Sequence, residues 1–174
     1  MLAVLSYPVT NTLIVMGGLE RMIDRQTVEG TATGEPEADA LLREDGNAVV
    51  IGVLLDQQVR AEMAFTGPHK LKERLGHLDM TKIAEMDSES FGEVFSESPA
   101  VHRFTNMMAG RTQDVAREIT DKYDGDASAI WSDGVGVDEV KARAGELPGF
   151  GDAKTETLVH ALDFFGHRDF EEVG

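Results

Sequence analysis

Apolar residues recur three and four positions apart along most of the chain, and short turn-forming stretches separate the segments with this spacing. The pattern is typical of amphipathic helices that share one core. It predicts helices in GEPEADALLREDG (34–46), TGPHKLKERLG (66–76), MTKIAEM (80–86), SESFGEVFSE (88–97), NMMAGRTQDVAREITDKYDG (106–125), SAIWSDG (128–134), VDEVKARAGEL (137–147) and DAKTETLVHALDFFG (152–166). We therefore predict an all-α fold, an array of about eight short helices.

Segment 47–65, NAVVIGVLLDQQVRAEMAF, is the most apolar part of the chain. It is apolar on nearly all sides up to Leu55 and amphipathic beyond that residue. Residues 49–51 would also suit a buried strand, but the unbroken continuation favours one central, buried helix. A separate helix is expected to begin at Thr66, because a proline follows within its first turn.

Residues 1–35 differ from the rest of the chain. They carry β-branched and small residues, followed by the turn-rich stretch GTATGEP. This composition is compatible with a short strand, a loose arm or an extension without a packed role. We predict a loosely ordered N-terminal extension over 1–35 and a single helical domain over 36–174, a division that suits a length of 174 residues.

The charge and cysteine content exclude several classes of function. The chain has 32 acidic and 16 basic side chains, a net charge of −16, and no cysteine. The absence of cysteine excludes disulfides, thiolate zinc sites, iron–sulfur clusters and a cysteine nucleophile. The acidity argues against a broad basic surface for nucleic acid and suits a halophilic protein. An acidic cytosolic protein is the alternative.

The N-terminal stretch does not have the pattern of a membrane span or a secretory signal. Its apolar patches are interrupted by Pro8 and by the polar residues 10–12, well short of the roughly 20 residues that a span needs. A basic region, expected at the start of a secretory signal, is missing. The sequence thus predicts a cytoplasmic protein without a membrane partner.

The most specific motif is Leu147-Pro148-Gly149-Phe150-Gly151, which lies between two predicted helices. Glycines two positions apart allow a tight turn and bring backbone amides close to an external group. The second helix begins at once, so its free N–H groups and the positive end of its dipole face the same point. The motif resembles the hairpin of helix-hairpin-helix proteins, in which backbone amides and a bound monovalent cation hold a DNA phosphate.

A second segment extends this resemblance to one family. Leu54-Leu55-Asp56-Gln57-Gln58 is similar to the end of a buried helix in the helix-hairpin-helix GPD family of base-excision DNA glycosylases (the endonuclease III-like superfamily). The stretch 102–111, with Arg103 and Arg111, also resembles that family's middle segment. The likeness covers roughly residues 36–165 and is greatest for the short members of the family that lack an iron–sulfur cluster.

The resemblance implies a DNA repair function and assigns site residues. Gln58 takes the position of the wedge that fills the gap left by a flipped base, with Gln57 and Asp56 beside it. The resemblance and the motif together give the following expected DNA-binding residues: Gln57, Gln58, Arg103, Arg111, Leu147, Gly149, Phe150, Gly151 and Lys154. The carbonyl region of Gly149 and Gly151 would hold the monovalent cation, K⁺ or Na⁺. No organic cofactor is implied.

Two departures from the family pattern limit the expected chemistry. Members that also cut the strand carry a lysine two residues after the second hairpin glycine, where this chain has Ala153, so Schiff-base lyase activity is not expected. The family's catalytic aspartate follows the second hairpin helix, and Asp169 is the nearest match, with Glu171 and Glu172 as alternatives and Asp56 as a further candidate.

The expected partner is double-stranded DNA with a damaged or mismatched base. The expected activity is that of a monofunctional DNA N-glycosylase, which flips and removes such a base by hydrolysis. The alternative is a non-catalytic protein of the same fold that binds DNA and recognises lesions. A helical protein-interaction module with an incidental LPGFG is a third interpretation.

Overall fold

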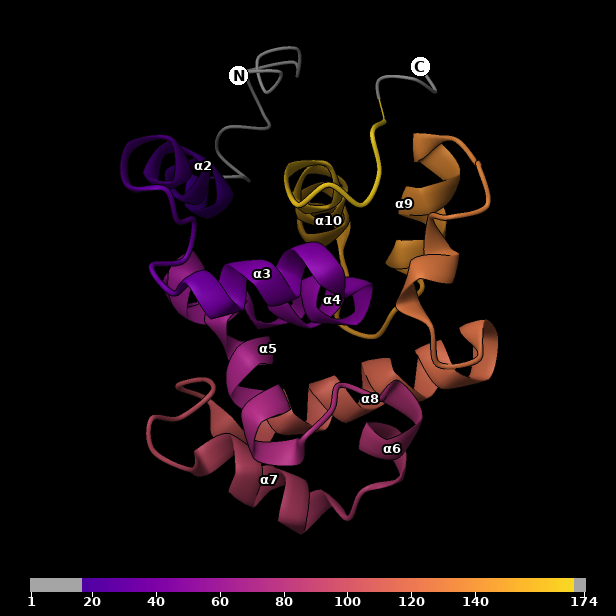
Figure 1. Cartoon of the computed structure of the whole chain (residues 1–174). Coiled ribbons are helices and arrows are strands. Elements are labelled where there is room, and N and C mark those ends of the chain that lie inside the picture. The colour runs from indigo at the N-terminus through magenta and orange to yellow at the C-terminus, as the bar shows by residue number, and fades with distance from the viewer. Residues whose placement is uncertain (1–16, 171–174) are drawn as a thin grey trace.

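The fold consists entirely of helices in the part of the chain that the computed structural model describes, residues 17–170 (Figure 1). The elements are α2 (Gly17–Glu29), α3 (Pro36–Glu44), α4 (Gly46–Leu55), α5 (Ala61–Leu75), α6 (Met80–Glu85), α7 (Ser88–Ser96), α8 (Thr105–Tyr123), the 3₁₀ helix η2 (Ala127–Ile130), α9 (Val137–Gly145) and α10 (Asp152–Phe164). The predicted all-α class is confirmed. Within these residues, none of the helices combines the length and the apolar character that crossing a bilayer requires.

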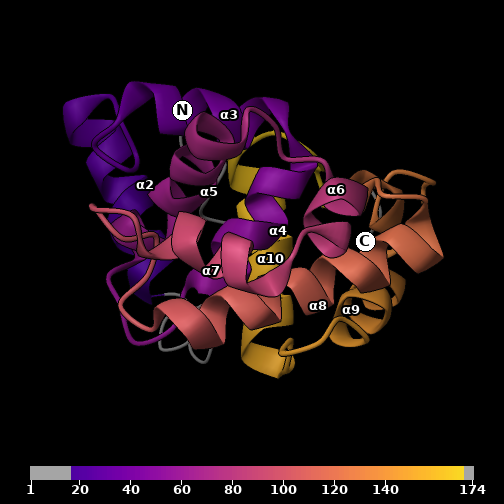
Figure 2. The same cartoon turned by 90° about the horizontal axis from the view of Figure 1, so that it is seen from below.

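Helix α4 lies in the middle of the molecule in both views (Figures 1 and 2). Every residue from Ala48 to Leu55 is buried, which explains why this segment is apolar on all sides. It packs against α3, α5, α10 and η2. Gly52 allows the close approach of α5, because a Cβ atom there would lie 2.6 Å from Cδ1 of Phe65. The remaining helices bury their apolar faces around this central one.

The prediction of one helix over 47–65 was wrong. Helix α4 ends at Leu55, residues 56–60 form a turn, and α5 begins at Ala61, so that Pro68 lies inside α5. The expected helix start at Thr66 is wrong for the same reason. Ala61, Ala64 and Phe65 are buried against the core, and this burial favours helix on the N-terminal side of Pro68. It outweighs the loss of one backbone hydrogen bond at an internal proline. The alternative of a strand at residues 49–51 is also excluded.

The described part of the N-terminal region is packed, contrary to the expectation of a loosely ordered extension. Residues 17–29 form α2, whose Leu19 and Met22 are buried and which contacts α5 and α10. Gly18 approaches α5 so closely that a Cβ atom there would lie 2.7 Å from Cβ of Ala61. Burial of apolar side chains therefore ties this helix to the core. Residues 1–16 lie outside the described range.

The turn between α2 and α3 is fixed by the buried carboxylate of Asp39. It accepts hydrogen bonds from the hydroxyls of Thr31 and Thr33 and from the backbone amides of Ala32 and Thr33, at 2.5–3.0 Å. Burial alone would raise the pKa of Asp39, but these bonds outweigh it and lower the pKa. The ionised carboxylate therefore stabilises the turn.

Replacement of Asp39 by Ala is expected to lower the free energy of unfolding by about 1–3 kcal/mol, because two buried amides lose their acceptor. A lowered pKa means that this stabilisation is present above the ordinary carboxyl pKa and is lost as the pH falls through the folded-state value. Denaturant unfolding at neutral and acidic pH should show the difference shrinking on acidification. Asp24→Ala, at an exposed carboxylate of α2, is the control and should change little. An equal effect of both variants would contradict the assignment.

Candidate functional site

The LPGFG segment forms the tight connection between α9 and α10. Leu147 and Phe150 are buried in the core, whereas Gly149 and Gly151 are exposed. Gly149 has φ of +83°, a left-handed conformation that favours glycine. A Cβ atom at Gly149 would lie 3.6 Å from Cδ1 of Leu54, so the turn rests on the last turn of α4. Two of the predicted binding residues thus hold the turn in place with their side chains, and the two glycines present backbone to the outside.

The backbone of this turn leaves amide groups available at the start of α10. The amide of Phe150 donates to the carbonyl of Leu147 at 3.0 Å, and the carbonyl of Gly151 accepts from the amide of Thr155 at 3.0 Å. Gly151 is the N-cap of α10 and has no side chain to bind the first-turn amides. These amides and the helix dipole favour an anion at this point. The exposed carboxylate of Asp152 opposes one.

Two distant side chains hold the end of α4. The ammonium of Lys154, in the first turn of α10, donates to the carbonyls of Val53 and Asp56, each at 3.2 Å. Nε2 of the buried His102 lies 3.1 Å from the carbonyls of Leu55 and Gln57, while its Nδ1 accepts from the amide of Phe104. This set of bonds requires a ring that carries its proton on Nε2. The carbonyls of Val53 and Leu55 also accept the backbone amides of Asp56 and Gln57, so Lys154 and His102 add side-chain donors to a helix end that is already partly paired.

Gln58 follows directly after this clamped segment. It has φ of +56°, which is uncommon for a residue other than glycine, and its side chain is exposed. Gln57 is half-buried, and its carbonyl is one of those that His102 binds. A left-handed residue of this type costs free energy, so the surrounding contacts must impose it. The structure therefore places an exposed amide side chain just beyond the end of the most buried helix, on a left-handed backbone.

The two predicted arginines lie near the same clamp. Arg103 is exposed and its guanidinium stands 5.1 Å from the centre of the Phe104 ring. Arg111 on α8 is half-buried and close enough to Lys154 to lower its pKa electrostatically. Arg103, Arg111 and Lys154 thus bring three cationic side chains to this part of the molecule, where Asp56 and Glu62 supply opposing charge. The ammonium of Lys154, however, is bound to α4; its direct contact with DNA stays a prediction.

Asp56 and Asp169 lie at opposite ends of α4. Asp56 is the C-cap of α4 and interacts electrostatically with Lys154. Asp169 follows Arg168, which donates to the carbonyls of Trp131 and Val135, and Trp131 packs at Gly46, the start of α4. Ten helical residues separate these ends by about 14 Å along the axis. The structure therefore brings Asp56, not Asp169, next to Gln58. Glu171 and Glu172 lie outside the described residues.

Burial shifts the pKa values of Asp56, Lys154 and His102, which lie near Gln58. It raises the pKa of Asp56, against the opposing charge of Lys154, and it lowers the pKa of Lys154, against the opposing charge of Asp56. It also lowers the pKa of His102, against the effect of the two carbonyls on its ring, which favours a neutral imidazole at neutral pH. A carboxyl with a raised pKa beside an exposed polar side chain is a candidate for acid–base chemistry.

A comparison of the chain with protein-family models, with curated proteins and with solved structures finds no match.

Proposed function

We propose that the protein is a DNA base-excision repair protein that binds duplex DNA through the LPGFG turn and inserts Gln58 where a base has been flipped out. The observation that carries the proposal is the exposed, left-handed Gln58, which directly follows residues whose carbonyls Lys154 and His102 bind, at the end of α4 on which that turn rests. A side chain that replaces a base must be rigid and able to form hydrogen bonds, and an amide meets both needs. The proposed helix-hairpin-helix motif comprises α9, residues 147–151 and α10.

An acidic protein can bind DNA in this way because the contact uses backbone amides instead of a broad basic patch. The exposed amides at Gly149 and Gly151, with the start of α10, would receive one phosphate. The residues also fit a monovalent cation, since the turn exposes backbone at both glycines and the carbonyl of Gly151 accepts only one bond from Thr155 among the backbone contacts of the described residues. Such a cation, K⁺ or Na⁺, would add positive charge opposite the phosphate.

The proposed activity is hydrolysis of the N-glycosidic bond of a damaged or mismatched base, without strand cleavage. Water would add to the sugar carbon and the base would leave with a proton. Asp56 is the carboxylate nearest to Gln58 in sequence and shares its end of α4, while the family resemblance favours Asp169. Ala153 stands where strand-cleaving relatives carry lysine, so the product would be an intact strand with an abasic site.

The experiment that tests this function is an assay of base release on a panel of duplexes with damaged or mismatched bases. The buffer contains high potassium, and alkali is added afterwards to reveal abasic sites. Release from at least one duplex, without a borohydride-trapped adduct, is the expected result. Selective binding of a lesion without release would favour the non-catalytic alternative. That alternative is supported by the separation of Asp169, the catalytic candidate from the resemblance, from Gln58. Absence of duplex binding would overturn both.

Two variants in the hairpin are expected to change duplex affinity in opposite directions. Gly151→Ala should weaken binding roughly tenfold, because the added methyl group obstructs the phosphate path to the amides. Its backbone φ of −90° and the open space around it leave the fold unaffected. Asp152→Asn should strengthen binding, because it removes a negative charge from the same helix start. Fluorescence anisotropy with labelled duplex measures both effects, and circular dichroism checks folding. Unchanged affinity in both variants would contradict a phosphate at this turn.

A further inference from the structure

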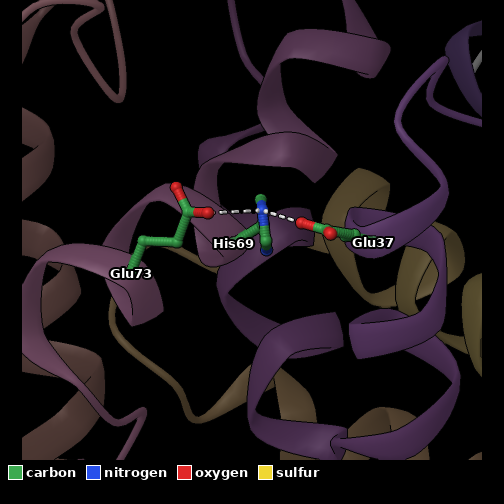
Figure 3. A group of neighbouring side chains, drawn as sticks. All are labelled: Glu37, His69 and Glu73. Carbon is green, nitrogen blue, oxygen red and sulfur yellow. Dashed lines mark ion pairs between the residues drawn. The ribbon is translucent and has the colours of Figure 1, made fainter.

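We propose a second site, a binding site for a late first-row divalent metal ion such as Zn²⁺, formed by Glu37, His69 and Glu73. Figure 3 shows the two carboxylates directed at the same ring nitrogen of His69 from either side. Nε2 of His69 lies 3.2 Å from Oε1 of Glu73 and 3.5 Å from Oε2 of Glu37, and all three ligand atoms lie within 4.8 Å of one another. The ligands come from two helices, α3 and α5.

These distances suit metal ligands better than hydrogen-bonded partners. Charge-assisted hydrogen bonds measure about 2.7–2.9 Å, and both contacts are longer. Zinc binds imidazole nitrogen and carboxylate oxygen at about 2.0–2.2 Å, so neighbouring ligands of a tetrahedral ion stand roughly 3.3–3.5 Å apart. A single Nε2 proton cannot serve two carboxylates well, whereas an ion between the three groups satisfies all of them. The exposed glutamate side chains can rotate to close the remaining distance between their oxygens.

The surroundings leave room for the ion and for a further ligand. The three residues line a surface cavity of ≈ 370 Å³, which is also bordered by Glu44, Lys72 and Gly76. His69 is only 17% exposed, so its ring is held in place, while Glu37 and Glu73 are largely exposed and can reach an ion from solvent. His69 and Glu73 are four residues apart on α5, the spacing that places two ligands on one helix face.

An imidazole with two carboxylates favours zinc, iron, cobalt or nickel over magnesium and calcium, which prefer oxygen alone. Water would complete the coordination from the cavity side. The ion would connect α3 to α5. The residues that line this cavity do not come from α9 or α10, which form the proposed DNA-binding hairpin. The site does not depend on the proposed DNA function, and its test uses the metal alone.

The test is calorimetric titration of the chelator-treated, full-length protein with ZnCl₂ in a buffer that contains KCl and excess Mg²⁺ to mask nonspecific cation binding. The wild-type chain should bind one Zn²⁺. His69→Gln and Glu73→Gln should each weaken binding by at least about tenfold. Cobalt titration gives a second measure, since loss of the nitrogen ligand in His69→Gln should change the visible spectrum of bound Co²⁺.

His77→Gln and Glu85→Gln are the matched controls, because they make the same substitutions outside the cluster. Both should bind Zn²⁺ with wild-type affinity. Absence of Zn²⁺ binding by the folded wild-type protein would overturn the site. Equal weakening in the cluster and control variants would overturn it too, because the metal would then be held by the general negative charge of the surface. All substituted groups are at least partly exposed, and circular dichroism verifies that each variant is folded.

Discussion

Replacement of Lys154 by Met is expected to weaken binding of duplex DNA by at least about tenfold and to lower the free energy of unfolding by about 1–3 kcal/mol. The ammonium donates to the carbonyls of Val53 and Asp56, and methionine fills similar space without a donor. The carbonyls of Val53 and Asp56 would then lose a charged donor, and the turn that carries Gln58 would lose its connection to α10. Denaturant unfolding and fluorescence anisotropy with labelled duplex measure the two effects.

Lys141→Met is the matched control for this variant. Lys141 lies on α9 and forms an ion pair with Glu156 on α10. This ion pair connects α9 to α10 and does not involve α4. Loss of a partly exposed pair costs at most about 1 kcal/mol, and the change in net charge is the same. A weakening of DNA binding that is equal in both variants would assign the effect to charge alone. Unchanged binding by Lys154→Met would show that the clamp does not position Gln58.

The helices were predictable from sequence where a local pattern decides them. Leu158 and Leu162 repeat at helical spacing, and glycines such as Gly76 and Gly125 end helices in the left-handed conformation. The break after Leu55 was not predictable in this way. It depends on His102 and Lys154, which lie 45 to 101 residues away from the carbonyls they bind. Local propensity favours continuation, and these long-range bonds stop the helix.

The candidate site was predictable in part for the same reason. The tight turn at Gly149 and Gly151 follows from a local motif, whereas Gln58 was assigned from the family resemblance, and the predicted continuous helix did not include its left-handed backbone. The role of His102 had no such signal, since a lone histidine before an arginine is common. Asp169 was preferred as the catalytic residue because it is the first acidic residue in the loop after α10, where the family that the sequence resembles carries its aspartate. In the structure, Arg168 fixes that loop at Trp131, away from Gln58.

Conversion of Asp56 to Asn is expected to reduce base release at least about 100-fold, if the protein acts as the proposed glycosylase. Asp56 shares the end of α4 with Gln58 and Lys154, while the neighbouring Glu62, in the first turn of α5, adds a negative charge that raises the pKa of Asp56 further. An ionised carboxylate there can activate water or stabilise the positive charge that develops on the sugar as the base leaves. Asparagine has nearly the same shape but cannot do either. Single-turnover assays on the duplex with the fastest release measure the loss.

Stability separates this catalytic role from a structural one. Burial raises the pKa of Asp56, so its contribution to stability is complete below the ordinary carboxyl pKa and is lost as the pH rises through the folded-state value. At neutral pH the charged carboxylate therefore opposes folding, and Asp56→Asn should unfold at an equal or higher denaturant concentration than the wild type. Duplex binding should persist. Lost activity with retained stability and binding is the pattern of a catalytic group.

Asp169→Asn is the matched control, because it makes the same substitution at the other end of α4. We expect it to retain base release, since its loop is fixed at Trp131. The reverse result, full release by Asp56→Asn and loss in Asp169→Asn, would assign the chemistry to the loop after α10, as in the family that the sequence resembles. Loss of both folding and activity in Asp56→Asn would contradict a raised pKa of Asp56. With a raised pKa, the buried charge opposes folding at neutral pH, and a neutral side chain removes that charge.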